Sequence, residues 1–144
     1  YRVPGEEVAM VQTTLTVVTG SREQMVDITA QVREVVAESG MSDGVCLVFS
    51  THTTAAVTIN EGYDPDVTHD LLLALDTMVP QNAGYRHAEG NSAAHMKASL
   101  LGASQTVTVV GGDLLLGTWQ AIWFCDFDGP RKRTVMVTLL EASA

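Results

Sequence analysis

The stretch VCLVFSTHTTAAVTIN, residues 45–60, contains two apolar segments on either side of a short polar one. Segments 45–50 and 55–60 are rich in aliphatic and β-branched residues, and each has the length of an ordinary buried strand. The polar residues between them include His52. This stretch therefore predicts two successive strands with a histidine at their junction.

Four further segments have the composition of strands. Residues 11–19 alternate between apolar and polar side chains, as expected of a half-buried strand. The segments 105–110, 114–127 and 133–142 are rich in β-branched and aromatic residues and are separated by glycine-containing turns at 111–113 and 128–130. Most of the chain is thus expected to form antiparallel sheet.

Three helices are expected between these strands. The first follows the strand at 11–19, with Asp27 or Thr29 as its cap and Gly40 at its end. The second begins at Pro65 behind an Asp64 cap and stops before Pro80. The third, shorter helix runs from Asn91 or Ser92 to Gly102. The expected apolar positions are Ile28, Val32, Val35 and Val36 on the first helix and Val67, Leu71, Leu75 and Met78 on the second.

Length and composition narrow the class of protein. A chain of 144 residues corresponds to one domain, so we expect an α+β fold over residues 1–144 in which predominantly antiparallel β-sheets pack against two or three α-helices. A net charge of −9 argues against general nucleic-acid binding, and no apolar run is long enough for a membrane helix. Cys46 and Cys125 lie in apolar strands, where buried thiols are expected, and the expected compartment is the cytoplasm.

Three of the four histidines are candidate metal ligands. His52 lies at a strand end, His87 in a loop and His95 near the start of the third helix. Three neutral imidazoles suit zinc or a similar divalent ion. The spacing alone is also compatible with isolated polar histidines, because no short two-histidine metal motif is present. His69, on the second helix beside Asp70, is expected to face solvent.

Several side chains are candidates for binding an anionic ligand. Asn91 and Ser92 stand at a helix start, where free backbone N–H groups attract phosphate. Arg131 can contact a phosphate at two points, whereas Lys132 and Arg133 are expected to face solvent.

Other candidates lie near the strand ends. Glu61 and Glu89 are candidate general bases or partners that orient an imidazole, and the alternative for both is a solvated loop carboxylate. Thr118 and Gln120 can hydrogen-bond a ligand. Trp119 can stack on a flat heteroaromatic ring, or it is a core or interface aromatic residue.

Three motifs resemble the YjbQ family, also called secondary thiamine-phosphate synthases, over about residues 10–140. They are HTTAAVTINEGYDPDV (52–67), YRHAEGNSAAHMKASLLG (85–102) and LGTWQAIWFCDFDGPR (116–131). The resemblance implies a compact fold of antiparallel sheets with flanking helices, a homotrimer, and a cleft around His52, His87 and His95. One departure is Ala93, where the family commonly has aspartate. If that carboxylate orients a histidine ligand, its loss lowers metal affinity by about 10- to 100-fold.

Two functions from different classes follow. The first is a metal-dependent enzyme acting on a small phosphorylated metabolite, either with thiamine-phosphate synthase-like activity or as a metal-assisted hydrolase. Its cofactor would be a divalent metal ion, with zinc preferred over nickel or magnesium, because imidazoles do not favour magnesium. The second is a non-catalytic, metal- and anion-binding trimer. Under both functions we expect a small phosphorylated ligand. We expect neither nucleic acid nor a membrane as a partner.

Overall fold

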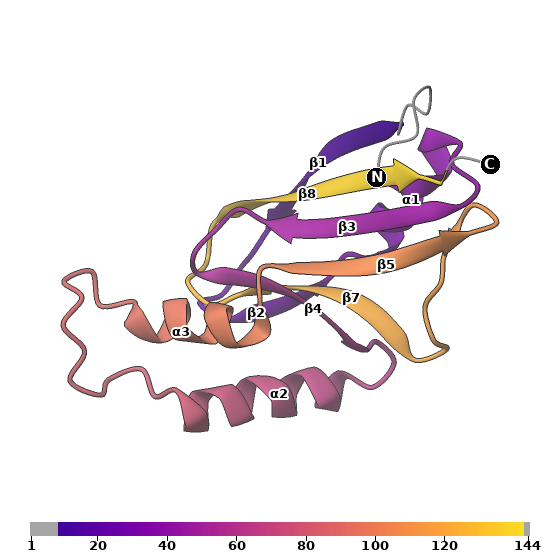
Figure 1. Ribbon diagram of the computed structural model, residues 1–144. Coiled ribbons are helices and arrows are strands. Elements are labelled where there is room, and N and C mark those ends of the chain that lie inside the picture. The colour runs from indigo at the N-terminus through magenta and orange to yellow at the C-terminus, as the bar shows by residue number, and fades with distance from the viewer. Residues whose placement is uncertain (1–8, 143–144) are drawn as a thin grey trace, which may run out of the picture.

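The computed structural model describes residues 9–142, which form two antiparallel sheets and three helices (Figure 1). The larger sheet has the strand order β1-β8-β3-β5-β6, and the smaller has the order β2-β7-β4. The predicted α+β class is confirmed. The strands are β1 (Met10–Val18), β2 (Gln24–Asp27), β3 (Gly44–Ser50), β4 (Ala55–Glu61), β5 (Ser104–Val110), β6 (Asp113–Leu114), β7 (Gln120–Asp126) and β8 (Lys132–Glu141), and the helices are α1 (Thr29–Ser39), α2 (Pro65–Met78) and α3 (Ser92–Leu101).

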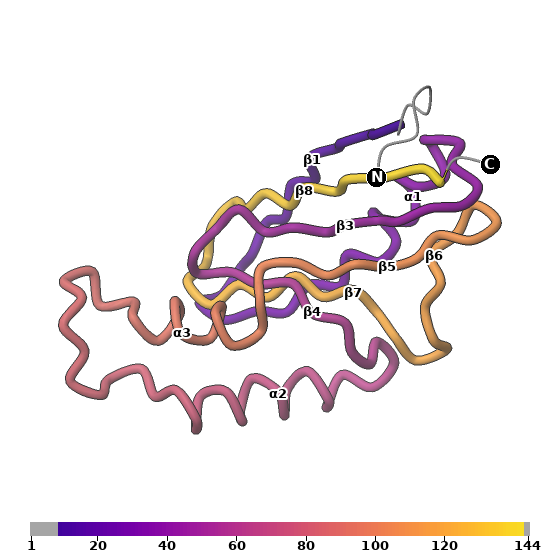
Figure 2. The backbone as a smooth tube through the Cα atoms, in the orientation of Figure 1, coloured from indigo at the N-terminus to yellow at the C-terminus, as the bar shows by residue number. Residues whose placement is uncertain are grey.

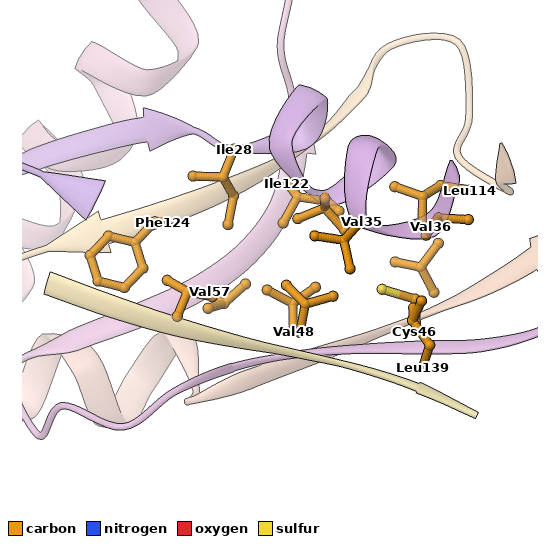
Figure 3. Close-up of a cluster of buried hydrophobic side chains, with 14 of the residues drawn as sticks. Ile28, Val35, Val36, Cys46, Val48, Val57, Leu114, Ile122, Phe124 and Leu139 are labelled. Atoms are coloured by element: carbon orange, nitrogen blue, oxygen red, sulfur yellow. The ribbon is translucent and has the colours of Figure 1, made fainter. Parts of the chain in front are cut away.

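The main core lies between the five-stranded sheet on one side and α1 with the three-stranded sheet on the other. Figure 3 shows Val35 of α1 and Ile122 of β7 next to Val48 of β3, and Phe124 of β7 next to Val57 of β4. Strand alternation explains this core, because every second side chain of β3, β7 and β8 faces inward. The predicted apolar face of α1 is buried as expected.

A second, smaller core attaches α2 and α3 to the other face of the three-stranded sheet. Ala56 and Cys125 of that sheet pack with Leu75 of α2 and with Ala94 and Ala98 of α3. Both cysteines are free and buried, and burial raises the pKa of Cys46 to about 11 and that of Cys125 to about 12. The expectation of buried thiols is therefore confirmed.

Helix α2 lies on the surface of the molecule. Its N-cap is the predicted one, since the Asp64 carboxylate accepts the N–H of Asp66 at 2.9 Å. The predicted apolar stripe is only partly buried: Leu75 is the one fully buried side chain of the helix, and Met78 is 66 % exposed. The period of the apolar stripe was predicted correctly, but the rest of a single chain covers only part of it.

A buried lysine links α2, α3 and the turn before β2. Lys97 of α3 has no exposed surface, and its ammonium donates to Glu23 and Asp76. The hydrogen bond from Lys97 is the main reason that the pKa of Asp76 lies below its usual value. A charge that is fully buried requires such partners. The ion pairs therefore fix how α2 and α3 sit relative to one another.

The outer face of the five-stranded sheet is apolar and rich in threonine. Phe49 pairs across strands with Met136, and Val45 pairs with Leu140. Phe49 is 39 % exposed and Leu140 38 % exposed, and no helix among residues 9–142 packs over them (Figure 1). None of the helices in this described part of the chain is long and apolar enough to cross a bilayer.

The backbone places three chain turns at one end of the molecule. The turn between β3 and β4 contains His52, and the turn between β7 and β8 contains Asp128. The segment 79–91, which carries His87, links α2 to α3 beyond the sheets (Figure 2). The candidate ligands for a metal or an anion therefore come from three different connections.

Candidate functional site

A pocket of about 350 Å³ lies where these turns meet the start of α3. The turn between β3 and β4 contributes residues 51–54, and the connection between β7 and β8 contributes Asp128, Arg131 and Arg133. Glu89, Asn91 and His95 complete the lining. The pocket therefore combines two histidines, two arginines, two carboxylates, an amide and three threonine hydroxyls.

The floor of the pocket is a buried ion pair between the two sheets. Arg133 of β8 donates from Nη2 to Oδ1 of Asp126 at 2.6 Å and to Oγ1 of Thr54 at 2.9 Å. Thr19 donates to the other oxygen of Asp126 at 2.7 Å. The side chain of Arg133 is 3 % exposed and that of Asp126 is fully buried. The expectation that Arg133 faces solvent is wrong, whereas Lys132 is exposed as predicted.

The state of Asp126 follows from these contacts. Burial alone would raise its pKa, but hydrogen bonds from Arg133, Thr19 and the backbone N–H of Asp128, together with the charge of Arg133, outweigh burial. The net result is a pKa below the usual value for aspartate. Asp126 is therefore ionised at neutral pH and compensates the charge of Arg133.

The rim of the pocket is a second set of polar contacts around Asp128. Its Oδ2 accepts from Nδ2 of Asn91 at 2.9 Å and from Nη2 of Arg131 at 3.2 Å. Asn91 occupies the predicted N-cap position of α3, but its side chain makes no capping bond. Ser92 is the first residue of α3 and does not line the pocket.

Two buried polar atoms at this site have no partner within residues 9–142. They are Nε of Arg133, on the floor, and Oδ1 of Asn91, on the rim. A buried donor without an acceptor costs free energy, and such atoms are few in native proteins. The guanidinium of Arg133 therefore keeps hydrogen-bonding capacity that no other residue within 9–142 uses.

His52 is held by the backbone of β8. The N–H of Thr134 donates to Nε2 of His52 at 2.9 Å. Burial, followed by the charge of Arg133, lowers the pKa of His52 below its usual value, while Asp126 acts in the opposite direction. His52 is therefore neutral at pH 7.

His87 and His95 lie next to each other. Their ring centroids are 5.4 Å apart with an interplanar angle of 76°. Nε2 of His87 lies 3.7 Å from Oε2 of Glu89, whose side chain is largely exposed. Within the part of the chain that the structure describes, no three His, Cys, Asp or Glu side chains are arranged to hold one ion. His69 is exposed, as expected, and lies beside Asp70 at 3.1 Å.

The remaining candidates lie at the other end of β4. Glu61 is the last residue of that strand and pairs with Gln120, whereas His52 precedes its first residue. Thr118, Trp119 and Gln120 line a separate depression of about 760 Å³. In one chain, the structure therefore does not bring these four residues to the His52 pocket.

This second depression has an aromatic wall. Trp119 and Tyr63 pack edge to face with centroids 4.9 Å apart, and both are largely exposed. Oε2 of Glu61 is buried and lacks a partner among residues 9–142. In a single chain, the two groups of candidate residues therefore lie in two separate regions.

Comparison with known proteins defines the family. The family model for UPF0047 protein YjbQ-like matches residues 13–142. The chain belongs to the YjbQ (UPF0047) family. The UPF0047 protein YugU of Bacillus subtilis is 49 % identical over 88 % of this chain and 97 % of its own length. A UPF0047 protein of Methanocaldococcus jannaschii is 47 % identical over 85 % of this chain and 88 % of its own length.

Solved structures of the YjbQ family share this architecture. A YjbQ/UPF0047 protein from Clostridium acetobutylicum superposes with a TM-score of 0.87 at 51 % identity, covering 88 % of this chain and 98 % of its own. A YbjQ-like protein of unknown function from Sulfolobus solfataricus gives a TM-score of 0.91 at 33 % identity, covering 94 % of this chain and all of its own. The predicted family and fold are both confirmed.

The YjbQ motifs flank the pocket, but the buried residues beneath it were missed. Asp126, Asp128 and Thr54 were not predicted as site residues. The signal for the floor is strand alternation: Asp126 shares a face with Phe124, and Arg133 shares one with Val135. Charged residues at core-facing positions indicate a buried pair. Ala93 is buried in the first turn of α3.

Replacing Asp126→Asn tests the pocket floor. It leaves the Arg133 cation buried without a counter-charge, so the free energy of unfolding should fall by about 3–5 kcal/mol at pH 7. Because the folded-state pKa of Asp126 is depressed, the wild-type contribution is present above about pH 4 and lost as the pH falls below it. The difference between variant and wild type should therefore shrink in acid. Urea unfolding between pH 7 and pH 3 measures this.

The control is Asp113→Asn, which removes an exposed pair with Arg33. Its expected cost is below about 1 kcal/mol. Equal stability of wild type and Asp126→Asn at pH 7 would contradict the assigned role of the buried pair.

Proposed function

We propose that this protein is an enzyme acting on a small phosphorylated metabolite, and that the phosphate binds in the His52 pocket. The observation that carries the proposal is that two arginines, Arg131 and Arg133, line one pocket. Arg133 is buried, and its Nε has no partner within the described residues. Phosphate recognition relies on such charge-assisted N–H donors. Asn91, at the start of α3, adds an amide close to a helix N-terminus.

Phosphate binding exchanges contacts that already exist at the rim. Arg131 is held by Asp128 at 3.2 Å, and a phosphate can replace that carboxylate as the partner of the guanidinium. Arg133 keeps Asp126 as its counter-charge through Nη2, and its Nε and Nη1 make no hydrogen bond within residues 9–142. The floor therefore has no net charge when no ligand is bound, and Arg131 on the rim is the cation that can change its partner.

Glu89 is the pocket side chain suited to proton transfer. It lines the pocket and is solvent-exposed. In one chain Glu61 is not available for this role, because it lies at the far end of β4. The reactions to test are a thiamine-phosphate synthase-like transfer, which expels pyrophosphate from a methylene carbon, and hydrolysis of phosphate esters; both act on phosphorylated substrates.

A divalent metal ion is a further part of the proposal. His87 and His95 have the separation of imidazoles that share a zinc ion with nitrogens about 2.0–2.1 Å from it. Zinc fits these nitrogens better than magnesium, and nickel is the other candidate. When bound, such an ion would polarise a phosphoryl oxygen. In its observed orientation His52 does not fit as the third ligand, because Nε2 already accepts the Thr134 N–H.

A non-catalytic binding protein is the second candidate. It is favoured by the extent to which the pocket groups satisfy one another, since Asp128 pairs with Asn91 and Arg131, and Asp126 pairs with Arg133. Such a pocket can hold an anion without presenting a poised base. Binding without turnover would select this alternative.

Arg131→Gln should weaken binding of inorganic phosphate by about 10- to 100-fold, because it removes a charge-assisted hydrogen bond. Isothermal titration calorimetry measures the binding. Arg33→Gln is the control, since Arg33 is an equally exposed arginine paired with an aspartate outside this pocket. Turnover of thiamine precursors and a panel of phosphate esters should fall in parallel. Phosphate binding that is unaffected by Arg131→Gln would refute the site.

Zinc bound by the purified untagged protein should decrease in both His87→Ala and His95→Ala, because each removes one imidazole ligand. Elemental analysis after dialysis against zinc measures the stoichiometry. The matched control is His69→Ala, which removes an exposed histidine on α2. Equal zinc content in all four proteins would exclude the proposed ligand pair.

We also propose that three copies assemble through the outer face of the five-stranded sheet. Support comes from its uncovered apolar residues, centred on Phe49 and Met136, and from the scarcity of charge on this face in a chain of net charge −9. Light scattering should give three times the 15.4 kDa of one chain. Phe49→Glu should reduce this mass to that of a monomer, whereas Leu73→Glu on exposed α2 should not. A wild-type mass of one chain would refute the assembly.

A further inference from the structure

We infer that His52 is a hydrogen-bond donor to the bound ligand through Nδ1–H, rather than a metal ligand or a general base. The inference rests on the proposed function for the identity of its acceptor, a phosphoryl or carboxylate oxygen. What it adds is a fixed role for one imidazole, derived from the backbone group that this imidazole contacts.

The backbone sets the tautomer of His52. Strand β3 ends at Ser50, which pairs with Val135, while β8 continues back to Lys132. Thr134 therefore lies one residue beyond the last β3–β8 pair, and its N–H has no β3 carbonyl to bind. Nε2 of His52 fills that place, accepting this N–H at 2.9 Å.

An amide N–H can only donate, so the lone pair of Nε2 is committed to it. A neutral imidazole carries one proton, which must then be on Nδ1. A proton on Nε2 would face the Thr134 N–H as donor against donor, which opposes formation of the imidazolium. Coordination of a metal by Nδ1 would require either loss of that proton or loss of the bond to Thr134.

Nδ1 is the ring nitrogen that remains for a ligand. His52 lines the pocket together with Arg131 and Arg133. Both hydrogen-bond contacts of the ring are at Nε2, and Nδ1 makes none among residues 9–142. A donor at the pocket surface beside two guanidinium groups is complementary to an anionic oxygen.

Thr51 and Thr134 support the same arrangement. The hydroxyl of Thr134 lies 3.3 Å from Nε2 of His52 and 3.4 Å from the hydroxyl of Thr51. These contacts hold the ring at its Nε2 edge and leave the Nδ1 edge free. The three residues thus act as one unit that positions a neutral donor.

The direct test is nuclear magnetic resonance of protein carrying ¹⁵N-labelled histidine. Long-range proton–nitrogen correlations should show His52 protonated on Nδ1 and unprotonated on Nε2 at pH 7. Addition of inorganic phosphate should shift the Nδ1 resonance and leave the tautomer unchanged. A proton on Nε2, or zinc bound at His52, would overturn the inference.

Two variants separate donation from other roles. His52→Gln keeps an acceptor for the Thr134 N–H and a donor for the ligand, but it can neither act as a base nor replace an imidazole at zinc. It should bind phosphate within a few-fold of wild type. His52→Leu removes both functions and should weaken phosphate binding by about 10- to 100-fold, the loss expected for a hydrogen bond to a charged group. Equal losses in both variants would contradict donation.

The outcomes also distinguish this inference from the proposed function. If the tautomer is as expected but the wild type binds neither phosphate nor phosphate esters, the proposed function fails and the ligand contact of His52 fails with it. If phosphate binds and Arg131→Gln weakens it while His52 is protonated on Nε2, only the present inference fails. His69→Gln is the control for the loss of an exposed imidazole.

Discussion

The buried ion pair between Arg133 and Asp126 is the interaction on which the candidate site depends. It joins the start of β8 in the large sheet to the end of β7 in the small one, so it fixes the separation of the two sheets beneath the pocket. Thr19 and Thr54 satisfy further polar atoms of the pair. A buried charge is tolerated only with such partners, because its desolvation is costly.

The same pair sets the chemistry above it. Since Asp126 balances Arg133, the pocket floor carries no net charge, yet Nε and Nη1 of Arg133 have no partner within residues 9–142. The charge of Arg133, after burial, contributes to the lowered pKa of His52. The bond from the Thr134 N–H then decides which ring nitrogen remains available. A structural ion pair and a strand end together produce a neutral histidine flanked by cationic donors.

The division of the predicted residues into two regions follows from the length of one strand. His52 and Glu61 are nine residues apart in a motif that reads as continuous, but β4 separates them by its whole extent at about 3.3 Å per residue. His87 and His95, which are eight residues apart, meet because the chain between them turns into α3. A similar spacing along the sequence therefore places side chains far apart in a strand, but close together where a loop leads into a helix.

The sequence by itself determined the strand and helix content, the caps at Asp64 and Gly40, the free cysteines and the family, because these depend on local periodicity, on cap chemistry and on contiguous motifs. It also contained the alternation that places Asp126 and Arg133 on core faces. Only the tertiary structure decided that these two meet, that Asp128 joins Asn91 to Arg131, and that Nε2 of His52 is occupied. Each of these contacts joins segments whose approach is set by how the two sheets pack, which no local pattern specifies.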